Sequence, residues 1–143
     1  MDQLLSGIKV LDLTRALAGP LCTSLLSDFG ADVVKVETRG SGDSSRQWPP
    51  FDGDRSLYFA SVNRGKRSIA IDMRSDRGRK LLRSLALDAD VLVENFRPGV
   101  LADMGLDGLP DHVPNYEVAH PSGRYPLAMI SPPARNFLNS TFV

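Results

Sequence analysis

Short runs of β-branched and aliphatic residues alternate with helix-like segments over the first hundred positions of the chain. An apolar run at residues 8–13 is long enough for a buried strand, and the valines within residues 33–36 form a second run. Between the two runs lies a stripe at helical spacing, made of Leu21, Cys22, Leu25, Leu26 and Phe29. The pattern predicts a strand, a helix whose apolar face is this stripe, and a second strand, joined in a parallel sheet.

Turn-forming residues mark the ends of these elements. The pair Gly19-Pro20 indicates the start of the first helix, because proline is tolerated in a first turn. Gly30 stands where a helix C-cap belongs. Glycines and prolines are dense over residues 40–50, which predicts a long loop, and the apolar segment within residues 51–62 is expected to pack on the core.

The same alternation continues further along the chain. Residues 68–72 and 91–93 are expected to form two more strands. Between them, Ser75-Asp76 can cap a helix that ends near residue 88. Residues 100–104 predict one further helical turn. Together these elements predict an α/β fold with a parallel sheet and flanking helices.

The character of the sequence changes after about residue 107. Six prolines follow within the last 36 positions, and proline breaks helices. Only residues 125–130 have the spacing of a strand. We therefore expect two parts, an ordered α/β segment over residues 1–107 and an irregular, proline-rich tail of unrelated appearance over residues 108–143.

Composition narrows the class of protein. Lys plus Arg and Asp plus Glu number 17 each, so no overall field favours nucleic acid or a membrane surface. The single cysteine, Cys22, excludes an internal disulfide framework and a cysteine-cluster metal site. The first six residues lack the basic flank and apolar core of a signal peptide. We therefore expect a cytoplasmic protein with no membrane segment.

Several short motifs follow one another in order along the first part of the chain. They are Gly7-Ile8-Lys9-Val10-Leu11-Asp12-Leu13-Thr14, Ala18-Gly19-Pro20, Phe29 to Glu37, Gly42-Asp43, Arg46, Tyr58-Phe59, Asn63 to Ser68 and Leu92 to Gly99. Together they resemble the opening of class III CoA-transferases, the CaiB/BaiF group that includes formyl-CoA transferase. The resemblance covers roughly residues 6–107 and depends on many short matches at compatible spacing.

This resemblance implies a Rossmann-like sheet belonging to the family's large domain, in a homodimer whose subunits interlock. It also implies transfer of CoA between carboxylic acids, with acyl-CoA as substrate and no tightly bound cofactor. In the family an aspartate attacks the thioester and carries the acyl group and then CoA, which is covalent catalysis by a carboxylate. That aspartate lies downstream of residues 95–99, so no catalytic residue is assigned and the chain alone is expected to be inactive. The alternative is a non-catalytic CoA-binding or dimerising remnant.

The tail has a shorter resemblance of its own. Residues 125–142 are similar to the start of the C-terminal barrel of molybdopterin oxidoreductases. A fusion, a rearranged reading frame or a gene remnant would each explain the two halves.

Two loops at strand ends are the first candidates for CoA contacts. The loop after the first strand ends in Leu17 and Ala18, and by resemblance both line the path of CoA. After the strand at residues 91–93 come Asn95, Phe96 and Arg97, which can hydrogen-bond the pantetheine arm, pack on it and pair with phosphate. The plainer interpretations are a tight connection and a turn with a solvated arginine.

Two further loops carry candidates whose roles stay open. Either Arg39 or its neighbour Thr38 matches the family's basic position for the nucleotide end. Asp72, Met73 and Arg74 match a CoA-contacting loop, although Asp72 can equally serve as a helix cap.

Other polar residues receive ordinary structural interpretations. Lys66 and Arg67 are expected to form a solvated basic turn, and Asp43 to pair with Arg46 at the surface. Cys22 is expected to be a buried small hydrophobe. His112 and His120, beside prolines of the tail, are expected to be exposed, and no metal site is predicted.

Overall fold

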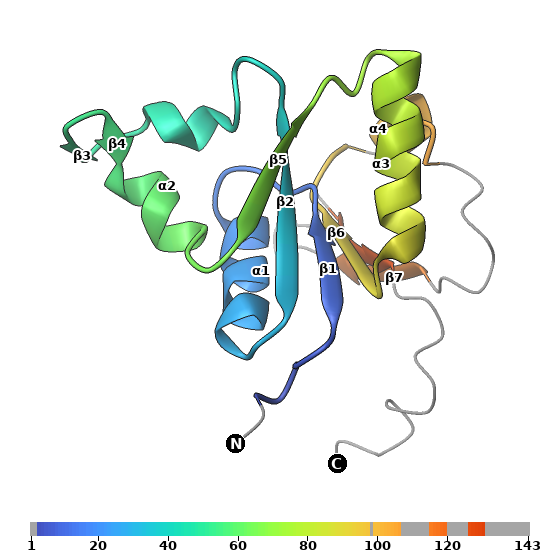
Figure 1. The fold of residues 1–143 in the computed structure, drawn as a ribbon, viewed down its shortest axis with the longest axis horizontal. Coiled ribbons are helices and arrows are strands. Elements are labelled where there is room, and N and C mark those ends of the chain that lie inside the picture. The colour runs from blue at the N-terminus through green and yellow to red at the C-terminus, as the bar shows by residue number, and fades with distance from the viewer. Residues whose placement is uncertain (1–2, 98, 107–114, 120–125, 131–143) are drawn as a thin grey trace.

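A computed structural model describes residues 3–97, 99–106, 115–119 and 126–130. Its centre is a six-stranded sheet in the order β5-β2-β1-β6-β8-β7 (Figure 1). The first four strands in this order run parallel to one another. They are β1 at Lys9–Asp12, β2 at Asp32–Thr38, β5 at Arg67–Ile71 and β6 at Val91–Glu94. Along the chain this is the order third, second, first, fourth, which is that of Rossmann folds.

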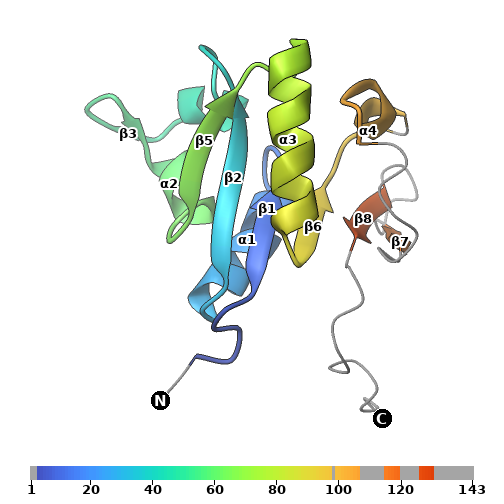
Figure 2. The same cartoon turned by 45° about the vertical axis from the view of Figure 1, so that its right-hand side comes forward.

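Two helices cover opposite faces of the parallel strands. Helix α1, Ala18–Asp28, connects β1 to β2 and lies behind the sheet in the view of Figure 1. Helix α3, Asp76–Asp88, connects β5 to β6 and lies in front, as Figure 2 also shows. The short helix α4, Val100–Asp103, follows β6. The predicted strands and helices of residues 1–105, including the turn at residues 100–104, are therefore confirmed.

The connection from β2 to β5 is more structured than a loop. It contains the 3₁₀ helix η1 at Ser44–Gln47, strands β3 at Phe51–Asp52 and β4 at Arg55–Ser56, and helix α2 at Leu57–Val62. The antiparallel hairpin β3-β4 was not predicted. Its strands have two residues each, which is too short for an alternating pattern to be visible in the sequence.

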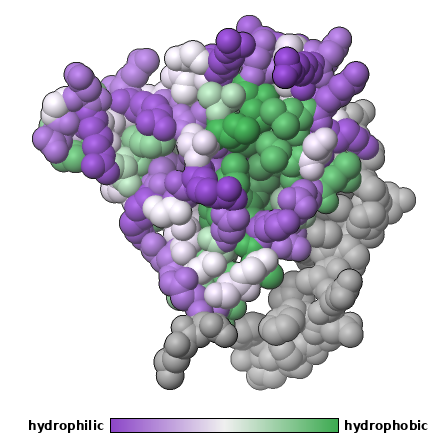
Figure 3. All heavy atoms as spheres, in the orientation of Figure 1, coloured by the Kyte–Doolittle hydropathy of each residue, from purple (hydrophilic) through white to green (hydrophobic). Residues whose placement is uncertain are grey.

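The core lies in two clusters, one on each face of the sheet, because successive side chains of a strand point to opposite faces. The cluster under α3 contains Leu11, Leu13, Val36, Ile71, Leu82, Leu92 and Leu106. The smaller cluster on the α1 side contains Val10, Ala31, Val33 and Val93. Figure 3 shows apolar side chains gathered at the surface around β5, β2 and α3. There a groove of about 590 Å³ is lined by Val34, Ile69 and Leu85, among others.

The apolar face predicted for α1 is wrong. The helix buries small or polar residues, Gly19, Pro20, Thr23 and Ser24, against the sheet. Leu21, Leu25 and Phe29 are instead 41%, 46% and 53% exposed, and Cys22 is only half-buried. The reason is that the sheet under the start of α1 is polar, so a hydroxyl such as that of Thr23 is needed there to satisfy Asp12.

Residues of the tail add strands to the sheet. Strand β8, Pro126–Ile130, confirms the predicted strand at residues 125–130 and pairs antiparallel with β6. Strand β7, Asn115–Ala119, was not predicted and pairs with β8. His112, His120 and most of the segment resembling molybdopterin oxidoreductases lie outside the described residues. Within residues 3–97, 99–106 and the two tail strands, no helix is long and apolar enough to cross a membrane.

Candidate binding site at the carboxyl end of the sheet

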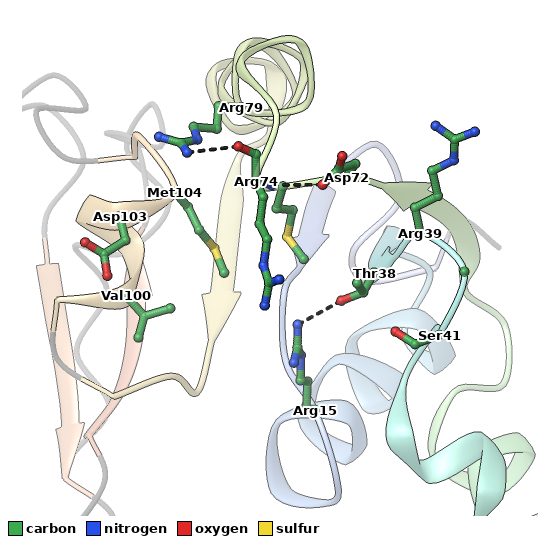
Figure 4. Close-up of a pocket in the computed structure, with 12 residues that line it drawn as sticks. Arg15, Thr38, Arg39, Ser41, Asp72, Arg74, Arg79, Val100, Asp103 and Met104 are labelled. Atoms are coloured by element: carbon green, nitrogen blue, oxygen red, sulfur yellow. Dashed lines mark hydrogen bonds between the residues drawn. The ribbon is translucent and has the colours of Figure 1, made fainter.

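A cavity of about 1080 Å³ opens where the parallel strands end. The loops after β1, β2 and β5 supply one part of its lining, and α3 and α4 supply the other (Figure 4). Ligands of open α/β sheets bind at this edge, beside the point where the strand order reverses. Its lining residues are Arg15, Thr38, Arg39, Gly40, Ser41, Asp72, Met73, Arg74, Arg79, Val100, Asp103 and Met104.

The cavity is cationic. Four arginines and two aspartates line it, so its ionisable side chains carry a formal charge of +2. Arg74 and Arg15 point toward one another across the opening, while Arg39 points away from it (Figure 4). The Arg79 guanidinium donates a 2.9 Å hydrogen bond to the Arg74 carbonyl. Guanidinium groups in this arrangement suit phosphate or carboxylate oxygens, which they can bind through paired N–H donors.

Arg15 is held in place by three neighbours. Its backbone exchanges two 2.9 Å hydrogen bonds with the side-chain amide of Asn95, one in each direction. Its guanidinium donates to the Thr38 hydroxyl at 3.1 Å and lies 5.4 Å from the centre of the Phe96 ring. Because Asn95 follows β6 and Arg15 follows β1, these bonds join the two loops at the reversal of strand order.

The turn between β5 and α3 forms another side of the cavity. Ser75 is the N-cap of α3, since its hydroxyl oxygen accepts a 3.1 Å bond from the Gly78 N–H. Asp72 lies before the helix, where its carboxylate accepts a bond from the Arg74 N–H at 3.2 Å. Of the two roles considered for Asp72, the helix cap therefore belongs to Ser75.

The nine residues predicted to contact a ligand fall into three groups. Arg39, Asp72, Met73 and Arg74 line the cavity. Asn95 and Phe96 lie behind the lining and contact Arg15. Leu17, Ala18 and Arg97 are exposed and are not among the lining residues. A ligand contact for any of the nine stays a prediction.

Sequence reasoning missed Arg15, Arg79 and Asp103. A signal for Arg15 was present, because it follows the first strand almost directly, at the edge where ligands bind. The first turn of a predicted helix also faces that edge, which points to Arg79. Asp103 belongs to a single helical turn whose placement against the sheet could not be inferred from its sequence.

Beneath the loops, the α1 side of the sheet holds buried ion pairs. The ammonium of Lys66 lies 2.9 Å from an Asp12 carboxylate oxygen, and both side chains are almost completely buried. It also donates to the Pro20 carbonyl and the Asn63 side chain. Burial lowers the pKa of Lys66, although Asp12 opposes this. The predicted solvated turn is therefore wrong for Lys66; Arg67 is exposed and pairs with Asp32.

A second buried pair corrects another prediction. Asp43 pairs with Lys35 at 2.9 Å, and both side chains are buried. Arg46 pairs instead with Glu37, donating two 2.7 Å hydrogen bonds to its carboxylate. The predicted pair of Asp43 with Arg46 does not form, because strand β2 presents Lys35 and Glu37 on the same face and each takes one of the two partners.

These contacts set the ionisation of the carboxylates. Burial acts to raise the pKa of Glu37, but hydrogen bonds from Arg46, Ser68 and the Asp43 N–H outweigh it and lower the pKa from 4.5 to about 2. Burial also raises the pKa of Glu94 at the end of β6, where the Phe96 N–H donates to the carboxylate at 2.6 Å. Among the described residues, no group of three or more His, Cys, Asp or Glu side chains could hold a metal ion.

The chain is similar to solved structures of one group of proteins. A CaiB/BaiF family protein from Brucella suis superposes with a TM-score of 0.69 and 46% identity, over 75% of this chain and 29% of that one. A hypothetical protein from Mycobacterium tuberculosis gives a TM-score of 0.68 and 40% identity, over 76% and 29%. The α/β fold predicted from the sequence is thus confirmed.

Proteins of known activity match the same region. Human succinyl-CoA:glutarate CoA-transferase is 53% identical over 103 residues, which are 71% of this chain and 24% of that protein. Succinyl-CoA:mesaconate CoA-transferase of Haloarcula hispanica is 52% identical over 118 residues, 78% and 30%. Formyl-CoA:oxalate CoA-transferase of Rhodopseudomonas palustris is 50% identical over 106 residues, 73% and 25%. The chain spans about a quarter to a third of these relatives' length.

A family model matches residues 5–110, which include every strand and helix that contributes to the cavity. This match covers well over half of the chain and agrees with the relatives and the solved structures. The chain therefore belongs to CoA-transferase family III.

Proposed function

We propose that this chain binds coenzyme A and its thioesters in the cationic cavity, and that it serves the transfer of CoA between carboxylic acids. The observation that carries the proposal is that Arg15, Arg74 and Arg79 line one cavity at the carboxyl ends of parallel strands, in a member of family III. Coenzyme A is an anion with several phosphates, and this edge of the sheet provides the matching charge.

The rest of the lining suits the other parts of the coenzyme. Met73, Val100 and Met104 offer apolar contacts for an adenine ring or a pantetheine arm. The cavity is at the upper end of the range of volumes usual for cofactor sites. Its mixture of charged and apolar residues therefore fits a long ligand that is charged at one end.

We propose that the carboxylic acid that accepts CoA is a small dicarboxylate, by analogy with the relatives' activities. Glutarate, mesaconate and oxalate are named as their substrates, and all three are small dicarboxylates. We assign the described residues a binding role and no nucleophile. Asp12 and Asp43, two buried aspartates, are each paired with a lysine and do not line the cavity.

The binding test is calorimetric titration of the chain with CoA. Arg79→Met is expected to weaken CoA binding at least about fivefold, because one charge-assisted contact to phosphate is lost. The matched control is Arg77→Met, an exposed arginine two residues earlier in α3 that does not line the cavity. Equal affinity of the two variants, or no binding by the folded wild-type chain, would refute the proposal.

We further propose that the chain associates with a second copy of itself. The support is the row of apolar side chains that α1 leaves at the surface, Leu17, Leu21, Leu25 and Phe29, which we call the α1 stripe. The cytoplasmic location and the absence of a tightly bound cofactor stay predictions.

A further inference from the structure

Two loops that line the cavity lie next to each other above the polar side of the sheet. The loop after β1 carries Arg15, and the loop after β2 carries Arg39 and Ser41. A ligand that contacts both loops requires a fixed separation between them. Apart from the Arg15 bond to Thr38, which is exposed, this separation depends on what lies underneath.

Underneath lies the ammonium of Lys35, which contacts both loops at once. It donates a 2.8 Å hydrogen bond to the Thr14 carbonyl, directly before Arg15. It also lies 2.9 Å from the Asp43 carboxylate, which follows Ser41 in the second loop. The Lys35 and Asp43 side chains are 2% and 1% exposed, so neither contact is weakened by solvent.

Both loops are fixed further by their own contacts to the same strands. The Thr14 N–H and hydroxyl donate to the Asp12 carboxylate at the end of β1, at 2.8 Å and 2.5 Å. The Asp43 N–H donates to the Glu37 carboxylate of β2 at 3.0 Å. Lys35 therefore joins two loops that are each also hydrogen-bonded to a strand of the sheet.

A buried ammonium is an unusual choice for mere packing. Next along the same face of β2 is Val33, 1% exposed, which shows that an apolar side chain serves where only packing is needed. A buried charge is costly unless it is paired and fully hydrogen-bonded. What a lysine adds at this position is a hydrogen bond to one loop and an ion pair to the other.

We propose that Lys35 is a positioning residue that sets the distance between the two loops and hence the spacing of Arg15 and Ser41 around the bound coenzyme. This inference rests on the proposed function for the identity of the ligand, but not for the loop geometry itself. Small displacements of positioned groups can have large effects on the chemistry of a site, on the order of a hundredfold in rate for about 1 Å.

The test compares two variants of the full chain. Lys35→Met/Asp43→Asn removes both charges together, so that no buried charge is left unpaired. It is expected to weaken CoA binding at least about tenfold. Val33→Ala, on the same strand and face, creates a small cavity in the core cluster that contains Val10 and Val93, away from both loops. It is expected to leave the affinity for CoA unchanged.

Amide hydrogen exchange supplies a readout that a general loss of stability would not produce. The Arg15 N–H donates to Asn95 and the Gly42 N–H to Thr38, so both amides report on loop order. Exchange at both should accelerate in the double variant relative to core-strand amides, and should not do so in Val33→Ala. Lys35→Leu/Asp43→Asn also removes both charges and should show the same acceleration at Arg15 and Gly42; it decides the matter if the Met variant does not fold.

These experiments distinguish the positioning role of Lys35 from the proposed binding of CoA. Unchanged loop exchange in the double variant, or equal acceleration in Val33→Ala, overturns the role of Lys35. If the wild-type chain fails to bind CoA while the exchange pattern is as expected, the proposed function falls and the positioning role stands.

Discussion

At the scale of single side chains, three buried carboxylates of this chain are paired with different partners. Lysine ammonium groups accompany Asp12 and Asp43, while an arginine, a serine and a backbone amide accompany Glu37. Removing one member of a buried pair typically costs about 3–5 kcal/mol, because the other is left as an uncompensated charge. The polar side of the sheet is therefore sensitive to single substitutions and to acid.

Glu37 allows the effect of acid to be measured. Its pKa of about 2 lies below the ordinary 4.5, so its stabilising contribution is complete above pH 4.5 and disappears as the pH falls toward 2. We expect the free energy of unfolding of the wild type to fall by about 1–3 kcal/mol more than that of Glu37→Gln over this interval. This range allows for the exposure of Arg46, whose side chain is 45% accessible.

Urea unfolding at several pH values between 2 and 7 checks this expectation. Asp88→Asn is a suitable control, since it removes a carboxylate whose pair with Lys9 is exposed, and exposed pairs contribute little to stability. Parallel pH curves for the wild type and Glu37→Gln would contradict the role of Glu37.

At the scale of elements, the start of α3 is fitted closely to the turn that lines the cavity. A Cβ atom on Gly78 would lie 1.9 Å from the Asp72 carbonyl oxygen, which belongs to backbone and cannot easily move. An alanine normally stabilises a helix relative to glycine by about 1 kcal/mol. Here we expect the opposite sign, with Gly78→Ala lowering the free energy of unfolding by about 1–3 kcal/mol.

Chemical denaturation of Gly78→Ala beside Ser84→Ala tests this sign. Ser84 is exposed on the same helix, so its replacement should be neutral or slightly stabilising. A gain in stability for Gly78→Ala would show that the backbone at Asp72 can shift to accommodate the added Cβ atom, which would contradict this expectation.

Element by element, the sequence predicted the strands and helices of the first hundred residues because each has a clear period or cap. It could not predict which side of α1 is buried, because hydrophobic spacing assumes an apolar surface opposite the helix. The polar surface under α1 is made by Asp12, Lys35 and Lys66, which are distant in sequence and meet only in the folded sheet. Four cavity residues were found from their loops. Arg15 and Arg79 were missed although their positions at strand and helix ends carried a signal, and Asp103 was missed because the placement of its helical turn depends on the folded sheet.

At the scale of the whole molecule, the described chain leaves apolar surface on both sides of the sheet. One is the α1 stripe, and the other is the groove beside α3 lined by Val34 and Ile69. Contiguous apolar patches on a folded protein usually mark contacts with other chains.

The α1 stripe leads to a prediction about association. Leu21→Gln/Leu25→Gln should shift the chain toward monomer in sedimentation velocity, while changing the free energy of unfolding by no more than about 0.5 kcal/mol per site. Leu82→Ala, at a fully buried position, is the contrasting control and should cost about 2–5 kcal/mol without altering association of the folded chain. Strong destabilisation of the chain by Leu21→Gln/Leu25→Gln would show that the α1 stripe is part of the core.

The two faces of the sheet should also respond differently to temperature. The side under α3 depends on aliphatic contacts, whose stabilising effect weakens as water is cooled. On the α1 side, buried ion pairs join β1 and β2 to the loops beside them, and the cost of keeping charges away from water decreases on warming. On cooling, the packing of α3 on the sheet should therefore weaken first. On heating, the Lys35 contacts that join the two loops should persist to higher temperature than the aliphatic contacts under α3.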